Sequence, residues 1–222
     1  MRTPAIVVNF KAYEAAVGRN ALSLARTCAA VTAETGASIA VCPPSFQLAQ
    51  VAAAVKIPVF AQHVDPRPAG SHTGHLTPHA ALQVGAAGTL LNHAERKLRP
   101  ADAGRTITLC RELGLEVIAC ADGLPEARRL ARLRPEFLAV EPPELIGGKV
   151  SVTSAKPEVV RSAVNAVHGI APEVQVLCGA GVKTAKDVRM ALELGTVGVL
   201  LASGIVLAKN PEKALRELAA AL

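Results

Sequence analysis

Three short polar segments of the chain carry the side chains best suited to chemistry. They are Asn9-Phe10-Lys11, Asn92-His93-Ala94-Glu95-Arg96 and Glu141-Pro142-Pro143, and each directly follows an apolar run typical of a β-strand. A lysine, a histidine and a glutamate can supply a positive charge, an imidazole that works near neutral pH, and a base. If these strands run parallel in one barrel, the side chains converge on one face.

Lys11 and His93 each have two interpretations. Lys11 is either a solvated turn residue or a cation that binds an anionic substrate and stabilises negative charge on an oxygen. His93 is either structural or a neutral imidazole that donates a hydrogen bond to a carbonyl oxygen and supports an enediolate. Glu95 is expected either to position Lys11 or to pair with Arg96.

Glu141 follows the run Phe137–Val140, which should be buried, so its carboxylate begins where the core opens. Desolvation there would raise its pKa and suit it to act as a base, whereas a solvated loop glutamate would have no such role. The following residues 142–149 have two prolines at one end and two glycines near the other, with Leu145-Ile146 between them. This pattern favours a rigid lid that moves on its ends, although an ordinary surface loop has the same composition.

Small residues follow two later apolar runs. Gly179-Ala180-Gly181 and Ala202-Ser203-Gly204 would let backbone N–H groups approach a ligand closely. The loops after strands seven and eight of parallel barrels often bind phosphate, so the pair of segments predicts a phosphate site.

A group of histidines suggests a metal site. His72, His75 and His79 are spaced closely enough to bring imidazoles together. However, Gly70, Gly74 and Pro78 interrupt any continuous helix, so the side chains need not share a face. We therefore expect a loop or a subunit contact here, and no metal site.

The candidate residues depend on alternating strands and helices. Strands are predicted at Ala5–Asn9, Ser38–Cys42, Pro58–Gln62, Thr89–Asn92, Glu116–Cys120, Phe137–Val140, Val174–Cys178 and Gly198–Leu201. Helices are predicted at Ala21–Thr32, Ser45–Val55, Pro78–Val84, Ala101–Leu113, Leu124–Ala131, Pro157–Val167, Thr184–Leu194 and Pro211–Ala221. Continuous apolar strands indicate a sheet covered on both faces. This alternation could form a closed barrel or a long doubly wound sheet. Because the strands number eight and no Gly-x-Gly-x-x-Gly follows the first, we predict an α/β protein with an eight-stranded parallel (β/α)8 barrel, in one domain over residues 1–222.

Composition narrows the classes of partner and compartment. The net charge of +6 is spread along the chain, with four Phe and one Tyr, so we expect no nucleic-acid binding. No apolar run is long enough to cross a bilayer and the N-terminus lacks a signal-peptide pattern, so we expect no membrane contact. The five cysteines are odd in number and none are at metal-ligand spacing, which indicates reduced thiols in a cytoplasmic protein.

The whole chain resembles the triosephosphate isomerases, in particular their shorter archaeal form. The resemblance is carried by the three polar segments and by Leu200-Leu201-Ala202-Ser203-Gly204. It implies interconversion of dihydroxyacetone phosphate and D-glyceraldehyde 3-phosphate in glycolysis and gluconeogenesis, without cofactor or metal. It also implies a base at Glu141 and an electrophile at His93. Substrate contacts are implied for Asn9 and Lys11, with phosphate contacts for Ile146, Gly181, Ala202 and Ser203.

The chain departs from the family pattern at Ala94, where many relatives have serine, and at Gly148-Lys149, where Thr-Gly is usual at the second hinge of the lid. The resemblance further implies a homo-oligomer, with a tetramer favoured over a dimer, in which the loop containing residues 70–75 packs into a neighbouring subunit. Two other functions fit fewer residues. One is a different phosphate-binding barrel isomerase of amino-acid biosynthesis, and the other is a catalytically silent phosphate-binding protein.

Overall fold

Short apolar runs form the strands at the centre of the structure, a computed structural model that describes residues 1–141 and 157–222. In this part of the chain, eight parallel strands form one sheet in the order β2-β1-β8-β7-β6-β5-β4-β3. The strands are β1 (Ala5–Asn9), β2 (Ser38–Cys42), β3 (Phe60–Ala61), β4 (Gly88–Leu91), β5 (Glu116–Ala121), β6 (Phe137–Val140), β7 (Gln175–Cys178) and β8 (Gly198–Leu201). Because all are parallel, their carboxyl ends open on one rim.

The two outer strands of this order meet and nearly close the sheet into a barrel. Val41 in β2 forms a parallel bridge with Val59, just before β3, and its N–H donates to the carbonyl of Pro58 at 3.0 Å. β3 is shorter than the predicted Pro58–Gln62, and Pro58 has no N–H to donate to a ladder. The Gln62 side chain donates to the carbonyls of Lys11 and Cys42. The predicted (β/α)8 barrel is confirmed.

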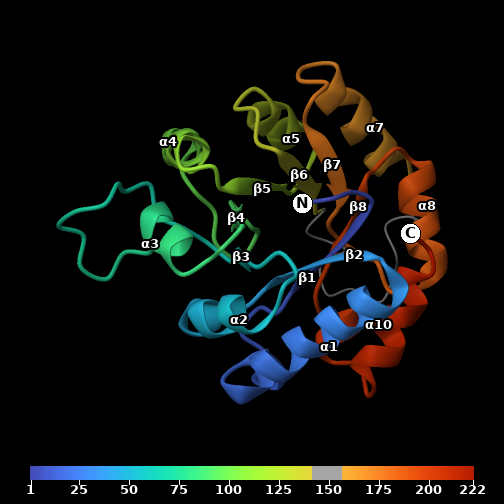
Figure 1. The fold of residues 1–222 in the computed structure, drawn as a ribbon. Coiled ribbons are helices and arrows are strands. Elements are labelled where there is room, and N and C mark those ends of the chain that lie inside the picture. The colour runs from blue at the N-terminus through green and yellow to red at the C-terminus, as the bar shows by residue number, and fades with distance from the viewer. Residues whose placement is uncertain (142–156) are drawn as a thin grey trace.

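Helices surround the barrel, as Figure 1 shows, and most lie where the sequence predicts them. They are α1 (Arg19–Thr35), α2 (Leu48–Ala54), α3 (Pro78–Gln83), α4 (Pro100–Glu112), α5 (Leu124–Ala131), α7 (Pro157–His168), α8 (Ala185–Glu193), α9 (Ser203–Val206) and α10 (Pro211–Ala219), with 3₁₀ turns η1 (Glu14–Ala16) and η2 (Ser45–Gln47). Local chemistry sets several ends. The Thr77 hydroxyl and the Asn210 amide oxygen accept N–H groups at the starts of α3 and α10.

The core has two layers. An inner cluster fills the barrel, and its members are Val7, Ala40, Cys42, Phe60, Leu90, Ile118, Cys120, Phe137, Ala139, Leu177 and Leu200. A larger cluster of Ala, Val, Leu and Ile lies between strands and helices. Alternate residues of each strand therefore face inwards and outwards, and both layers are apolar, which explains the continuous apolar runs.

Besides β3, the helical segments after β2 and β8 differ from the sequence prediction. The short helix α9 was not predicted, because Gly204 and the β-branched Ile205 and Val206 have weak helix propensity. Burial of Ile205 and Val206 stabilises it instead. The predicted helix Ser45–Val55 is divided into η2 and α2.

Candidate active site

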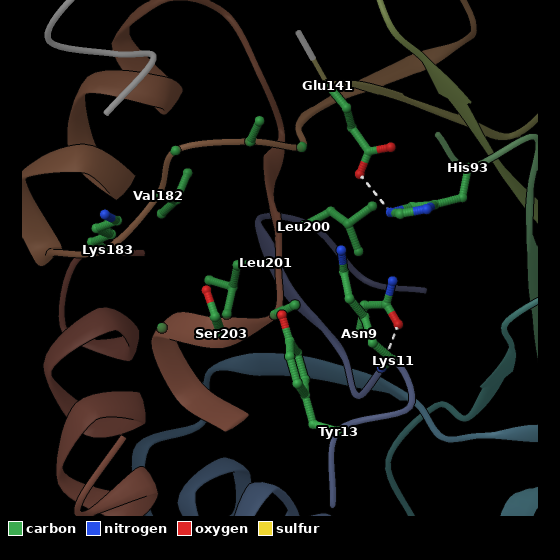
Figure 2. A pocket seen from close by; sticks show the side chains of 15 residues that line it. Asn9, Lys11, Tyr13, His93, Glu141, Val182, Lys183, Leu200, Leu201 and Ser203 are labelled. Carbon is green, nitrogen blue, oxygen red and sulfur yellow. Dashed lines mark hydrogen bonds and ion pairs between the residues drawn. The ribbon is translucent and has the colours of Figure 1, made fainter. Parts of the chain in front are cut away.

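The exits of β1, β4 and β6 bring three chemically capable side chains to one pocket. Figure 2 shows Lys11, His93 and Glu141 around this pocket, with Glu141 and His93 pointing toward each other. The Nε2 atom of His93 lies 3.5 Å from Oε1 of Glu141. The convergence expected from the strand exits is present in the structure.

The turn after β1 holds Lys11 in an unusual backbone conformation. Lys11 has φ 49°, a left-handed value that non-glycine residues adopt rarely. Its N–H donates to the Asn9 side-chain oxygen at 2.9 Å, and its carbonyl accepts from the Gln62 amide at 3.0 Å. Its Nζ lies 2.6 Å from Oε1 of Glu95. Glu95 therefore pairs with Lys11, which resolves the two alternatives that the sequence left open.

His93 is neutral in this environment. Burial lowers its pKa to about 4, and the positive charge of Lys11 acts in the same direction. Its Nδ1 accepts the backbone N–H of Glu95 at 3.1 Å, so the proton of the neutral ring lies on Nε2. The side chain therefore presents an N–H donor to the pocket.

Glu141 has the opposite response to burial. Only 3% of the residue is exposed, and burial raises the pKa of its carboxyl group to about 7, although the Cys120 thiol and the Lys11 charge oppose the shift. Its Oε2 has no hydrogen-bond partner within residues 1–141 and 157–222. The sequence predicted this direction, because a carboxylate at the edge of a buried strand loses hydration.

Small residues leave room for Glu141 and for a ligand. A Cβ atom at Gly179 would collide with Cγ of Glu141, so only glycine fits there. Gly181, Ala202 and Ser203 line the same pocket, from the loops after β7 and β8. A dianion bound against their backbone would lie across the pocket from Lys11.

A sequence profile described as "Triosephosphate isomerase" matches residues 4–220 of the chain. The chain belongs to the triosephosphate isomerase family. Curated triosephosphate isomerases of three archaea are similar along almost their whole length. Identity is 47% with that of Methanothermus fervidus, covering 98% of each chain. It is 46% with that of Methanocaldococcus jannaschii, covering 96% of this chain and 97% of the relative. It is 47% with that of Methanopyrus kandleri, covering 100% and 99%.

One residue expected from the resemblance to this family cannot be placed. Ile146 and the predicted lid 142–149, with the departure at Gly148-Lys149, lie outside the described residues. Ala94, the other departure, lies in the turn between His93 and Glu95 and is half-buried.

The histidine segment forms no metal cluster in the part of the chain that the structure describes. Instead, Asp65 is the common partner, with its carboxylate 3.1 Å from Nε2 of His63 and 3.3 Å from Nδ1 of His75. These residues fix the two ends of a long loop, since Asp65 also accepts the N–H of Leu76 at 2.7 Å. Arg96 approaches the same carboxylate at 3.7 Å, away from Glu95.

The sequence reasoning missed three residues of the pocket, Tyr13, Val182 and Lys183. Figure 2 shows the Tyr13 hydroxyl pointing into the pocket beside Leu201 and Ser203, with the ring packed on the core. Its position two residues after Lys11 was a usable signal, because a strand exit places nearby residues on the same rim. Among the described helices, none is long and apolar enough to span a bilayer.

Proposed function

We propose that this protein is a triosephosphate isomerase that interconverts dihydroxyacetone phosphate and D-glyceraldehyde 3-phosphate through an enediolate, in glycolysis and gluconeogenesis. The observation that carries the proposal is the pairing of a neutral His93 with a Glu141 whose pKa is raised to about 7. Membership of the family supports the same substrate. Proton transfer next to a carbonyl needs a base and an electrophile, and both are side chains of this pocket.

Glu141 is the base in this scheme. Its carboxylate removes a proton from the carbon next to the substrate carbonyl and returns it to the neighbouring carbon. A base with a pKa near the working pH is deprotonated often enough to accept the proton and basic enough to hold it. The proposed steps use neither a cofactor nor a metal ion, because Glu141 and His93 supply the base and the electrophile.

His93 is the electrophile. Its Nε2–H donates a hydrogen bond to the carbonyl oxygen, which gains negative charge as the enediolate forms, and the ring then moves protons between the two oxygens. A neutral donor suits this role. The pKa for loss of the N–H proton from a neutral imidazole lies closer to the pKa of the enediol than the pKa of an imidazolium does. Lys11 adds a positive charge, and Asn9 holds the Lys11 turn while contacting substrate.

The phosphate group is assigned to the loops after β7 and β8. Gly181, Ala202 and Ser203 would hold it through backbone N–H groups, and Ile146 from the segment 142–156 would add a further contact. Binding energy at the phosphate, remote from the reacting carbons, can be used to orient the substrate.

A coupled assay with both triose phosphates tests the activity. We expect turnover in both directions with no added metal or cofactor. 2-Phosphoglycolate resembles the enediolate and should bind at least about 100-fold more tightly than inorganic phosphate. Equal affinities, together with no turnover, would contradict the proposal and favour a protein that only binds phosphate.

We further propose a homo-oligomer, with a tetramer favoured over a dimer. The loop between β3 and α3 projects from the barrel, as Figure 1 shows, and is braced by the Asp65 contacts. Next to it lies an apolar hollow lined by Leu48, Val64, Leu76 and Val84. Phe46, 98% exposed, adds apolar surface close in sequence to Leu48, and surface of this kind marks protein contacts.

Light scattering measures this assembly. We expect the mass of a tetramer, and a smaller species for Phe46→Asp. A monomeric wild-type protein would contradict the proposed assembly. A cytoplasmic location is part of the same proposal, supported by five cysteines that are all free and buried.

A further inference from the structure

A polar cluster is centred on Glu126, which accepts a hydrogen bond from Asn92, the residue before His93. Glu126 is in the first turn of α5, which starts at the exit of β5, so its carboxylate reaches back toward the rim of the barrel. Among the described residues, donors surround it from several elements. Oε1 accepts from Asn92 Nδ2 at 2.9 Å and Arg129 Nη2 at 2.7 Å, while Oε2 accepts from Lys97 Nζ at 2.5 Å and the Asp122 N–H at 3.1 Å.

These contacts keep the carboxylate charged. Its side chain is only 16% exposed, and burial opposes the charge. The hydrogen bonds from Asp122, Lys97 and Asn92 overcome that effect and lower the pKa of Glu126 to about 2. A carboxylate with this many hydrogen bonds is a poor base, but it can fix the positions of its partners.

Asn92 is the partner that reaches the active site. It is buried and has φ 59°, a left-handed value, so the chain turns sharply there before His93. Besides Glu126, its Nδ2 donates to the carbonyl of Cys120 at 2.9 Å, and its Oδ1 accepts the N–H of Leu98 at 3.0 Å. Its side chain therefore closes the turn that carries His93 and ties that turn to β5.

We propose that Glu126 is a positioning residue that fixes the imidazole of His93 through Asn92. The chain of contacts is direct: Glu126 holds the amide of Asn92, and Asn92 sets the direction of the backbone that carries His93. Lys97 adds a second attachment, because it is four residues after His93 and binds the same carboxylate. This inference rests on the proposed role of His93 as electrophile.

Glu126→Gln tests the inference with the smallest change of shape. The variant removes the charge that holds Asn92 and Lys97, so the imidazole is less well oriented. We expect kcat to fall by between about tenfold and about 100-fold, with KM changed by less than about threefold, because misplaced catalytic groups affect turnover more than binding. Asn92→Gly keeps the left-handed conformation but removes the amide, and should reproduce the effect.

Glu136→Gln is the matched control. Glu136 is also a half-buried glutamate at a strand end, but it accepts the N–H of Val117 at 2.8 Å on the opposite rim of the barrel. The kcat of Glu136→Gln should equal that of the wild type. If Glu136→Gln and Glu126→Gln lower kcat equally, general weakening of the barrel explains both, and the inference is wrong.

A double-mutant cycle with His93→Gln separates positioning from stability. If Glu126 acts through His93, Glu126→Gln should change kcat by less than about twofold once the imidazole is gone. A full reduction of kcat in the His93→Gln background would overturn the inference. Nitrogen-15 spectra of the His93 ring give a readout independent of turnover. We expect Glu126→Gln to shift the His93 resonances while the Glu136→Gln spectrum matches the wild type.

The isomerase function and the positioning role of Glu126 can be refuted separately. A wild-type protein without isomerase activity would refute the proposed function, while the ring spectra would still report whether Glu126 orients His93. An active wild type, with kcat and ring spectrum unchanged in Glu126→Gln, would refute only the positioning role.

Discussion

Two glutamates at adjacent strand exits have opposite surroundings. Glu141 directly follows β6 and has a buried carboxylate oxygen with no partner among the described residues, and burial raises its pKa to about 7. Glu126 follows β5 and accepts from donors on four residues of the described chain, which places its pKa at about 2. β5 and β6 are neighbours in the sheet, so the difference arises over a short distance. A carboxylate that lacks hydrogen-bond donors, such as Glu141, is suited to proton transfer, whereas one surrounded by donors, such as Glu126, is suited to holding its neighbours in place.

The largest expected effect is on turnover in Glu141→Gln. The amide has the shape of the carboxylate but cannot accept a proton. We expect kcat to fall by at least about 10³-fold, or about 4 kcal/mol of barrier, with the far-ultraviolet circular dichroism unchanged. Activity within about tenfold of wild type would remove Glu141 from the role of base.

His93→Gln should have the next largest effect. It replaces the ring N–H with an amide N–H that is displaced from the developing oxyanion and cannot move protons between the substrate oxygens, and loss of one well-placed donor lowers kcat by about 10² to 10³-fold. Binding of substrate, measured by KM, should change less. An unchanged kcat would contradict the role of electrophile.

Glu141 also has a predicted effect on stability that depends on pH. Its folded pKa of about 7 lies above the ordinary value of about 4.3, so the folded state holds this proton more tightly than the unfolded state. The contribution is favourable below about pH 4 and is lost as pH rises through about 7. Glu141→Gln does not titrate. Relative to wild type it should gain about 2–3 kcal/mol in free energy of unfolding between about pH 5 and about pH 8, as measured by urea denaturation. A constant difference across this range would show that the carboxylate is not desolvated.

The smallest effect is expected for Arg129→Met. Arg129 supplies one of the hydrogen bonds to Glu126, but Asn92, Lys97 and Asp122 remain. The side chain of Arg129 is 32% exposed, so its ion pair with Glu126 should contribute no more than about 1 kcal/mol to stability. We expect kcat within about twofold of wild type. A decrease as large as that of Glu126→Gln would mean that the cluster depends on every donor.

These contrasts also explain what the sequence could predict. Strand exits are local features, so the pattern of apolar runs located Lys11, His93 and Glu141 and gave five-residue strands such as β1 and β2 with correct bounds. Desolvation of Glu141 followed from its position after a buried run. The partners of Glu126 lie 29 to 34 residues away in sequence at Lys97 and Asn92, and no local pattern pairs them. The bonding of Glu95 to Lys11, 84 residues apart, was undecided for the same reason.

The closure of the barrel has a mechanical consequence. β1 and β2 are in register over five residue pairs, whereas β2 meets the chain before β3 through the bridge between Val41 and Val59. Fewer backbone pairs hold this seam than hold β1 to β2, so amide hydrogens along it should exchange with solvent ahead of those in β1. Gln62 crosses the seam and binds the carbonyls of both Lys11 and Cys42. Opening of this seam would therefore disturb the turn that carries Lys11 before it disturbs His93 or Glu141, which follow β4 and β6.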